Sequence, residues 1–264
     1  MSNRYVELRP DQIEASLAVN PVIIIPWGAI EWHGPHLPLG LDGLVAEAFC
    51  DRLADRTGAL VLPTLWLPVT PLPHKLSLSI TTNIVTAMWE DLLEEICRLR
   101  VEVVCSVSGH YAQPHEQLIM EVAERIMDRK PATHILTGTP LSLLGDPDLL
   151  DHAGRYETGQ LLALRPDLVA LAVLGDGPLT AVRDNPVLGS DPRLASAHEG
   201  ETLLARGLDA WVDWTNRLRG PAPDLIGLRS LYEARRLDYR DFAERYFKSS
   251  WDDAIQTWWQ EKSQ

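Results

Sequence analysis

A carboxylate and an imidazole stand two residues apart in a short segment rich in glycine and proline. Glu31 and His33 are followed by His36 and, after Gly40, by Asp42. In an extended chain, residues i and i+2 point to the same side, so Glu31 and His33 can approach one ligand together. The glycines and prolines predict a turning loop that brings Asp42 back to the same point. Imidazole and carboxylate suit zinc, manganese or iron, so this segment predicts a divalent metal site that the Asp42 carboxylate bridges.

Two later segments carry residue types that fit the same chemistry. His110 closes the tripeptide Ser108-Gly109-His110, in which the glycine permits a tight turn. His152 and Glu157 lie farther along, before a helix that is expected to run to Leu164. Their separation along the chain does not by itself show that they converge with the first segment.

Each candidate also has a purely structural interpretation. An isolated Glu-x-His pair is more often a surface or turn feature, and Asp42 could instead cap the helix expected from about residue 43. His110 could be a hydrogen-bonded histidine at a strand end, His152 part of a helix N-terminus, and Glu157 an ordinary helical carboxylate. Three further residues are candidates for the substrate pocket, although such side chains more often lie in a core or a solvated loop: Trp32, His74 and Tyr111.

The elements that would position these residues alternate between short apolar runs and helical patterns. The runs at 22–25, 60–62, 101–107 and 134–137 predict strands, and the patterns near 42–56, 84–99 and 114–129 predict helices. This alternation predicts an α/β fold with a mainly parallel central sheet flanked by helices. Both 31–42 and 108–110 follow strands, and ligand sites in such sheets form beyond the carboxyl ends of the strands.

The rest of the chain is divided by loops and by a change of composition. Residues 65–73 contain three prolines and predict an irregular loop, as does 184–198. Beyond residue 223 charged and aromatic residues increase, which predicts helices that pack on the body or on a neighbouring subunit. We therefore expect a hydrolase domain over 1–222 and a helical, aromatic-rich extension over 223–264.

Composition excludes several classes of function. The 264 residues carry a formal net charge of -13, and the basic residues are scattered, which disfavours a nucleic-acid partner. No apolar run approaches the length that a bilayer requires, so no membrane role is expected. The first residues resemble no export signal, which predicts a cytoplasmic protein.

The long segment from Pro26 to Asp42 resembles the signature of the creatininase (creatinine amidohydrolase) family. Ser108-Gly109-His110 resembles the family's N-G-H, and His152-Ala153-Gly154 through Glu157-Thr158 resembles its H-A-G-x-x-E-T-S; the matches span about residues 20 to 205. The resemblance implies a three-layer α/β sandwich, often hexameric, that hydrolyses cyclic or linear amides of small molecules with two divalent ions.

Carried onto this chain, the resemblance assigns a role to each candidate. Glu31 and His110 would bind one ion, His33 the other, and Asp42 would bridge them. His152 would donate or accept a proton, a task that suits the ordinary imidazole pKa near 6.5.

Two departures from the family pattern affect the substrate. Creatininase has a ligand glutamate two residues after the histidine of N-G-H, where this chain has Ala112, and we expect Glu157 to replace it as ligand. Creatininase also has tryptophans that face the substrate before H-A-G, whereas no tryptophan lies between His110 and His152 here. Creatinine is therefore not the expected substrate.

These observations lead to one main hypothesis and two alternatives. The main hypothesis is a hydrolase that uses metal-activated water on a small cyclic amide or a formamide, with zinc, manganese or iron as the two ions. The first alternative keeps the metals but opens an oxidised inositol ring, a ring ketone. The second, motivated by Ala112 and the aromatic C-terminus, is a non-catalytic, metal-stabilised homo-oligomeric scaffold.

Overall fold

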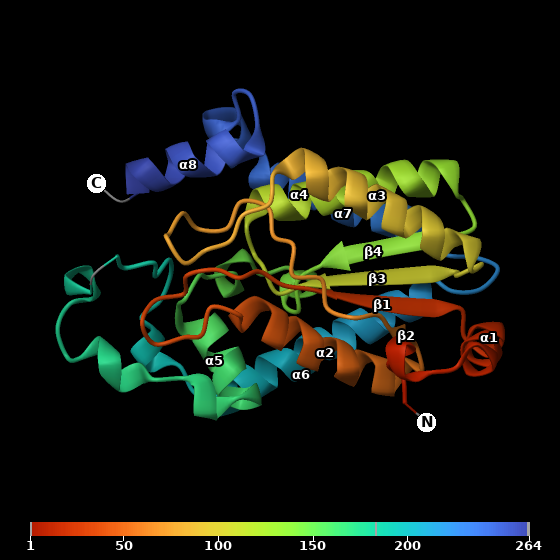
Figure 1. Ribbon diagram of the computed structural model, residues 1–264, viewed down its shortest axis with the longest axis horizontal. Helices are drawn as coiled ribbons and strands as arrows, with labels where there is room; N and C mark the ends of the chain where they lie inside the picture. The colour runs from red at the N-terminus through yellow and green to blue at the C-terminus, as the bar shows by residue number, and fades with distance from the viewer. Residues whose placement is uncertain (1, 183, 263–264) are drawn as a thin grey trace.

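The core of the protein is a four-stranded sheet in which every strand pair is parallel (Figure 1). The structure, a computed structural model, describes residues 2–182 and 184–262. The strand order is β2-β1-β3-β4, with the bounds β1 Val22–Trp27, β2 Leu60–Val61, β3 Val103–Ser108 and β4 His134–Gly138. The predicted parallel α/β fold is confirmed.

Helices cover both faces of this sheet and form three layers (Figure 1). On one face lie α2 (Leu41–Thr57), α5 (Arg155–Leu164) and α6 (Ala197–Arg217). On the other lie α3 (Thr82–Arg98), α4 (Gln113–Arg129) and α7 (Leu225–Tyr246). The remaining helices are α1 (Pro10–Val19) and α8 (Trp251–Lys262), and short 3-10 turns lie at Tyr5–Glu7, Ser142–Leu144, Pro147–Leu149, Pro166–Leu168, Leu171–Leu174, Leu179–Ala181 and Pro192–Leu194.

The apolar strands are continuous because both of their faces are covered. All six residues of β1 are buried, and so are all six of β3. A strand with one face in water would alternate apolar and polar residues instead. The core formed in this way holds the carboxyl ends of β1 and β3 rigidly side by side.

The two outer strands bond to neighbouring segments of the same chain. The Val61 N–H of β2 donates to the Asn3 carbonyl at 2.8 Å. On β4, the Tyr232 hydroxyl accepts from the Thr137 N–H at 3.1 Å and donates to the Ile135 carbonyl at 2.6 Å. Helix α7 is therefore anchored to the sheet by hydrogen bonds as well as by packing.

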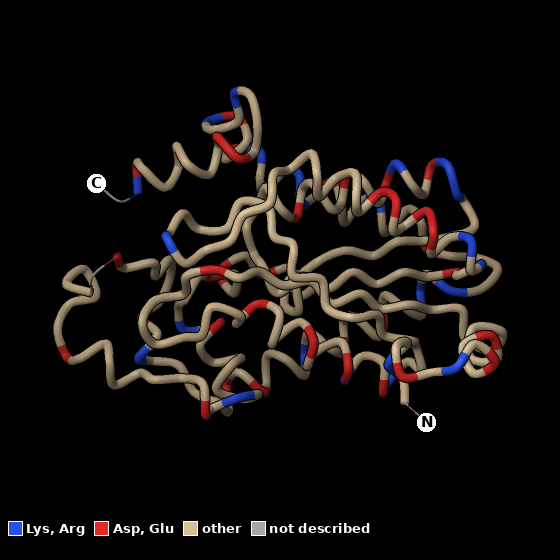
Figure 2. The backbone as a smooth tube through the Cα atoms, in the orientation of Figure 1, with Lys and Arg blue, Asp and Glu red and all other residues tan. Residues whose placement is uncertain are grey.

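The predicted C-terminal helices are α7 and α8, and α8 lies toward the end of the molecule to which the strands point (Figure 1). The proposed boundary at residue 222 stays a prediction. Figure 2 shows basic residues dispersed among acidic ones on the outer helices. Within the described chain, no helix combines the length and the apolar character needed to cross a membrane.

Candidate metal centre

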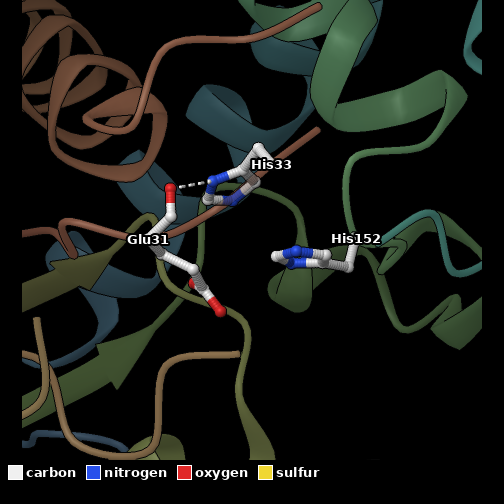
Figure 3. Close-up of side chains that lie close together, drawn as sticks. All are labelled: Glu31, His33 and His152. Carbon is white, nitrogen blue, oxygen red and sulfur yellow. Dashed lines mark hydrogen bonds between the residues drawn. The ribbon is translucent and has the colours of Figure 1, made fainter. Parts of the chain in front are cut away.

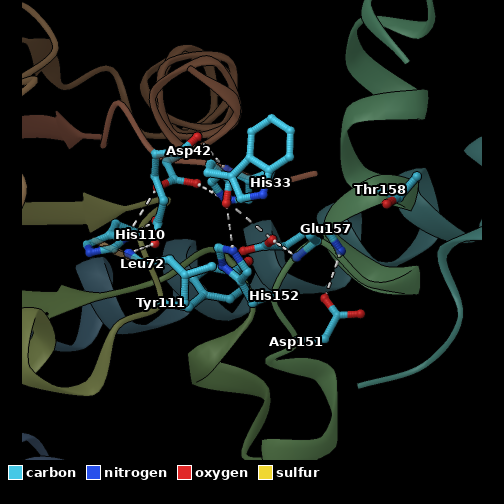
Figure 4. A network of polar contacts seen from close by, with 12 residues as sticks. His33, Asp42, Leu72, His110, Tyr111, Asp151, His152, Glu157 and Thr158 are labelled. Atoms are coloured by element: carbon cyan, nitrogen blue, oxygen red, sulfur yellow. Dashed lines mark hydrogen bonds and ion pairs between the residues drawn. The ribbon is translucent and has the colours of Figure 1, made fainter. Parts of the chain in front are cut away.

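Four elements bring their ends together beyond the sheet (Figure 4). Glu31 and His33 lie in the loop that follows β1, and His110 follows β3 by two residues. Asp42 is the second residue of α2, and Glu157 is the third residue of α5. The five side chains are all buried, with between 0% and 3% of their surface exposed.

Glycines allow helix α2 to approach the strands closely enough to deliver Asp42. A Cβ on Gly109 would lie only 2.0 Å from the Asp42 carbonyl oxygen. A Cβ on Gly28, at the end of β1, would lie 2.2 Å from the Cα of Gly43. Neither position accommodates a side chain unless the start of α2 moves away.

The first group of candidate ligands consists of Glu31, Asp42 and His110. The Nδ1 atom of His110 lies 2.8 Å from the Glu31 Oε2 and 3.3 Å from the Asp42 Oδ2. One atom from each residue lies within 4.8 Å of the others, so the group can hold one ion.

The second group consists of His33, Asp42 and Glu157. The Nε2 atom of His33 lies 3.0 Å from the Asp42 Oδ1 and 3.6 Å from the Glu157 Oε2. Asp42 thus directs one carboxylate oxygen to each group. A carboxylate shared in this way has the arrangement needed to bridge two ions.

Backbone carbonyls set which nitrogen of each imidazole is free. The His33 Nδ1–H donates to the Glu31 carbonyl at 3.1 Å, which leaves Nε2 free to face Asp42. The His110 Nε2–H donates to the Val69 carbonyl at 3.0 Å, which leaves Nδ1 free to face Glu31 and Asp42. Metal-binding histidines are oriented by this kind of second hydrogen bond.

The free atoms of both groups fit a divalent ion. Both carboxylate oxygens of Asp42, Oε2 of Glu31, Oε1 of Glu157 and Nε2 of His33 are buried without a hydrogen-bond partner. Buried polar atoms rarely lack a hydrogen-bond partner, and a bound ion would provide one for these atoms by coordination. Ligands about 2.0–2.2 Å from a tetrahedral ion lie roughly 3.3 Å apart, close to the separations found here.

The charges of this cluster balance through protonated histidines when no ion is bound. Burial opposes a charge on His33, but the Asp42 carboxylate outweighs it and raises the pKa of the imidazole to about 10. Burial likewise opposes a charge on His110, and the Glu31 carboxylate raises its pKa well above the ordinary value. Burial, reinforced by Asp42, raises the pKa of Glu157. An incoming ion would take the place of these protons.

His152 lies across from Glu31 and His33 (Figure 3). Its ring stacks on that of His33 with 4.4 Å between centroids, and its Nε2–H donates to the Trp32 carbonyl at 3.1 Å, which leaves Nδ1 free. Burial, reinforced by the charge on His33, lowers the pKa of His152 to about 4. The imidazole is therefore neutral over a wider pH range than its ordinary pKa implies.

The start of α5 carries a reciprocal cap that holds Glu157. The Asp151 carboxylate accepts from the N–H groups of Tyr156 at 2.8 Å and of Glu157 at 3.0 Å. In return, the Glu157 Oε2 accepts from the Ala153 N–H at 2.7 Å. This arrangement resembles a capping box and leaves Oε1 of Glu157 free. We did not predict the role of Asp151, because it lies six residues before Glu157, whereas the residues of a capping box are three apart.

The proline-rich loop after β2 supports the cluster through its backbone. Val69 supplies the carbonyl that orients His110, and the Leu72 N–H donates to the Glu31 carboxylate. Thr70, between them, has a φ of 54°, a conformation that is unfavourable for a β-branched residue. Backbone contacts of this kind leave no mark in residue types, so the sequence did not reveal them.

A cavity of about 190 Å³ opens onto the cluster. Its polar wall includes Glu31, His110 and His152, with Tyr111 and Ala112 beside them. The Ala112 side chain offers no ligand atom. Of the three side chains expected to line the substrate pocket, Tyr111 lines this cavity.

Trp32 and His74 line a separate hollow. Their rings stack with 4.4 Å between centroids, and the hollow is shared with the loop around residues 173–184. Trp32 contacts the metal centre through its carbonyl, which accepts from His152. The structure thus places Tyr111, and not these two side chains, at the cavity that opens onto the cluster.

Comparisons of the sequence with known proteins give consistent results. The sequence profile of the family described as creatininase, creatinine amidohydrolase, matches residues 6–215. Creatinine amidohydrolase of Pseudomonas putida is 28% identical over 75% of this chain and 90% of that protein. A mycofactocin precursor peptide peptidase of Mycolicibacterium smegmatis is 31% identical over 79% of this chain and 88% of that protein. A 3-dehydro-scyllo-inosose hydrolase of Thermotoga maritima matches over only 24% of this chain and 20% of that protein, at 35% identity.

Solved structures agree with the sequence comparisons. A creatinine amidohydrolase superposes with a TM-score of 0.72 at 25% identity, over 84% of this chain and 99% of that chain. A mutant creatininase described as a Zn–Zn type superposes with a TM-score of 0.67 at 25% identity, over 81% of this chain and 96% of that chain. A creatininase described with Mn gives the same TM-score and identity, over 81% of this chain and 97% of that chain. The matched profile covers most of the chain, and the buried carboxylates and imidazoles form candidate metal-binding groups. This protein belongs to the creatininase family of hydrolases.

Proposed function

We propose that this protein is a metal-dependent amidohydrolase that holds two divalent ions and hydrolyses a small cyclic amide or a formamide. The observation that carries the proposal is the position of Asp42, whose two free oxygens face two separate groups of ligands. Glu31 and His110 would complete one site, and His33 and Glu157 the other. Glu157 would thus take the place of the ligand that Ala112 cannot supply.

Two ions at these sites would lower the pKa of a water from about 15.7 toward about 7 and polarise the carbonyl of the substrate. Attack of such a water on the carbonyl carbon would form the new C–O bond, and the C–N bond would then break. His152, whose Nδ1 is free, would accept the proton of the water and pass it to the departing nitrogen. The cavity lined by Glu31, His110 and His152 gives a small substrate access to the first group and to His152.

Zinc and manganese are the ions we propose to test first. Carboxylate and imidazole ligands suit zinc, manganese and iron, and the related structures include a Zn–Zn and a Mn form. An amide is favoured over a ring ketone because the two relatives that match across most of their length are named for C–N hydrolysis. The match to the inosose hydrolase covers a fifth of that protein.

The decisive experiment loads the metal-free protein separately with zinc, manganese and iron and assays lactams, formamides and keto-inositols. We expect turnover of at least one amide that chelation abolishes and metal restores. Turnover of keto-inositols alone would replace the amide proposal with the ring-ketone alternative. If chelation lowers the melting temperature but no metal restores any hydrolysis, the protein is a metal-stabilised scaffold.

A further inference from the structure

The cavity at the metal centre has one wall built from the C-terminal helices. Besides Glu31, His110 and His152, it is lined by Phe242 of α7 and by Ile255 and Trp258 of α8. The phenyl ring of Phe242 and the indole of Trp258 lie 6.1 Å apart between centroids and are tilted by 60°. The lining of the cavity thus combines polar side chains of the candidate ligands with apolar and aromatic side chains of the C-terminal helices.

This wall is held in place at both ends of α8. At its start, the Asp252 carboxylate accepts from the N–H and the hydroxyl of Thr82, at 3.3 and 3.0 Å, where α3 begins. Near its end, Glu261 accepts from Arg245 at 2.6 Å and from the Tyr246 hydroxyl at 3.1 Å. The helix is therefore fixed against both α3 and α7, and Ile255 and Trp258 line the cavity from a helix whose position is set by these bonds.

The wall lies outside the part of the chain that the family profile matches. That match ends at residue 215, before α7 begins. The related creatinine amidohydrolase is covered over 99% of its length by only 84% of this chain. The candidate ligands thus belong to the region shared with the family, whereas the apolar wall belongs to the added C-terminal segment.

We propose that α7 and α8 form a specificity wall that selects amides with an apolar, aromatic-sized group on one side of the scissile C–N bond. The inference rests on the proposed amide hydrolysis and adds the substrate class. A cavity of about 190 Å³ is smaller than the roughly 300–1,000 Å³ of pockets for drug-sized ligands, so it admits a small molecule or the end of a chain. With the amide held beside Glu31, His110 and His152, its substituent would contact Phe242, Ile255 and Trp258 in the same cavity.

The test compares N-benzylformamide with N-(2-hydroxyethyl)formamide on the metal-loaded protein. We expect the wild type to favour the benzyl compound in kcat/KM, and Trp258→Ala to reduce the ratio of the two kcat/KM values about 10-fold, because an apolar contact is lost. Trp258→Phe keeps an aromatic ring and should retain most of the preference. Trp259→Ala is the matched control, since this neighbouring tryptophan on α8 does not line the cavity.

Binding is measured separately from hydrolysis, by calorimetric titration of both formamides. Melting temperatures identify any variant whose fold is lost. Equal kcat/KM for both compounds in the wild type would contradict the proposed role of the wall. The same reduction of the kcat/KM ratio in Trp258→Ala and Trp259→Ala would contradict it as well. If N-benzylformamide binds in a way that depends on Trp258 but no formamide is hydrolysed, the wall stands and the proposed reaction fails.

Discussion

At the scale of single residues, the arrangement of charge explains why these side chains lie together. Three buried carboxyl groups are involved, and Asp42 lies within 4.8 Å of a ligand atom of Glu31 in one group and of Glu157 in the other. Without an ion, the two protonated imidazoles of His33 and His110 balance the charges of Glu31 and Asp42, while the raised pKa of Glu157 favours its neutral form. Burial of such charges gains little stability by comparison with apolar packing. We attribute the cluster to metal binding and not to stabilisation of the fold.

Glu157→Gln separates these two interpretations. The amide keeps an acceptor for the Ala153 N–H but removes the charge, so we expect metal affinity at the second site to fall by at least about 100-fold. The metal-free variant should be no less stable than the wild type, because burial already disfavours the ionised Glu157. Metal content and melting temperature measure the two effects. The control is Glu116→Gln, at a buried glutamate outside both groups, which should leave metal content unchanged. Full metal content in Glu157→Gln would refute the assignment of Glu157 as a ligand.

Gly109→Ala tests the close approach that delivers Asp42. The added Cβ would meet the Asp42 carbonyl at 2.0 Å and push the start of α2 away. We expect a stability loss of about 1–3 kcal/mol together with a loss of bound metal. The matched control is Gly177→Ala, because nothing lies within 4 Å of a Cβ there. Both effects are read from urea unfolding and metal analysis, and equal behaviour of the two variants would contradict the steric argument.

At the scale of elements, the sheet and its covering helices follow from pattern alone. Continuous apolar runs predicted the four strands because strands buried on both faces have no polar side. Helices α1 and α6 went unpredicted, and α6 begins within the stretch 184–198 that was expected to be a loop. Helix α1 has no buried residue, and therefore little apolar periodicity to detect. The elements that carry the candidate ligands were all expected, because each ligand follows a strand or begins a helix.

The parts of the site that went unpredicted depend on backbone atoms or on tertiary packing. Val69 and Leu72 act through a carbonyl and an N–H that every residue possesses. Phe242 and Trp258 reach the cavity only because α7 and α8 fold back over the strand ends. An aromatic-rich C-terminus was evident in the sequence, but no local pattern states which surface it covers.

Tyr232 and Arg235 both attach helix α7 to β4, and Arg235 does so by donating to the Thr137 carbonyl. Tyr232→Phe removes a hydroxyl that both accepts from Thr137 and donates to Ile135, and leaves two buried backbone groups without partners. We expect a loss of about 1–3 kcal/mol in the free energy of unfolding, measured with urea. Tyr246→Phe is the control, since that hydroxyl bonds to the exposed Glu261 and should contribute less than about 1 kcal/mol. Equal losses in the two variants would show that the bonds to β4 are unimportant.

At the scale of the whole molecule, metal binding should couple to pH and to stability. In the metal-free protein the pKa of His33 is raised to about 10, whereas in the unfolded chain it is near 6.5. The protonated imidazole therefore contributes its full stabilisation below about pH 6.5, and this stabilisation is lost as pH rises through about 10. Metal binding displaces this proton, so metal affinity should increase over the same interval.

We therefore expect the difference in melting temperature between zinc-loaded and chelator-treated protein to widen from about pH 6.5 to about pH 9. At a metal concentration about 100 times Kd, bound metal adds about 2.7 kcal/mol. Calorimetry in buffers of different ionisation enthalpy should detect the release of protons near pH 7, including one from each imidazole. A heat of binding that does not depend on the buffer would refute the proton displacement.

The hydrogen bonds at the two outer strands have a further consequence for the whole molecule. The Asn3 carbonyl accepts a hydrogen bond from one backbone N–H of β2, and the Tyr232 hydroxyl bonds to two backbone groups of β4. An open strand edge is a template on which another chain can add a strand, and that is a common route to aggregation. Both edges are blocked by the protein's own chain, so copies that associate must meet through helices and loops. Tyr232→Phe would then do more than loosen α7: it would uncover a place for unwanted strand addition.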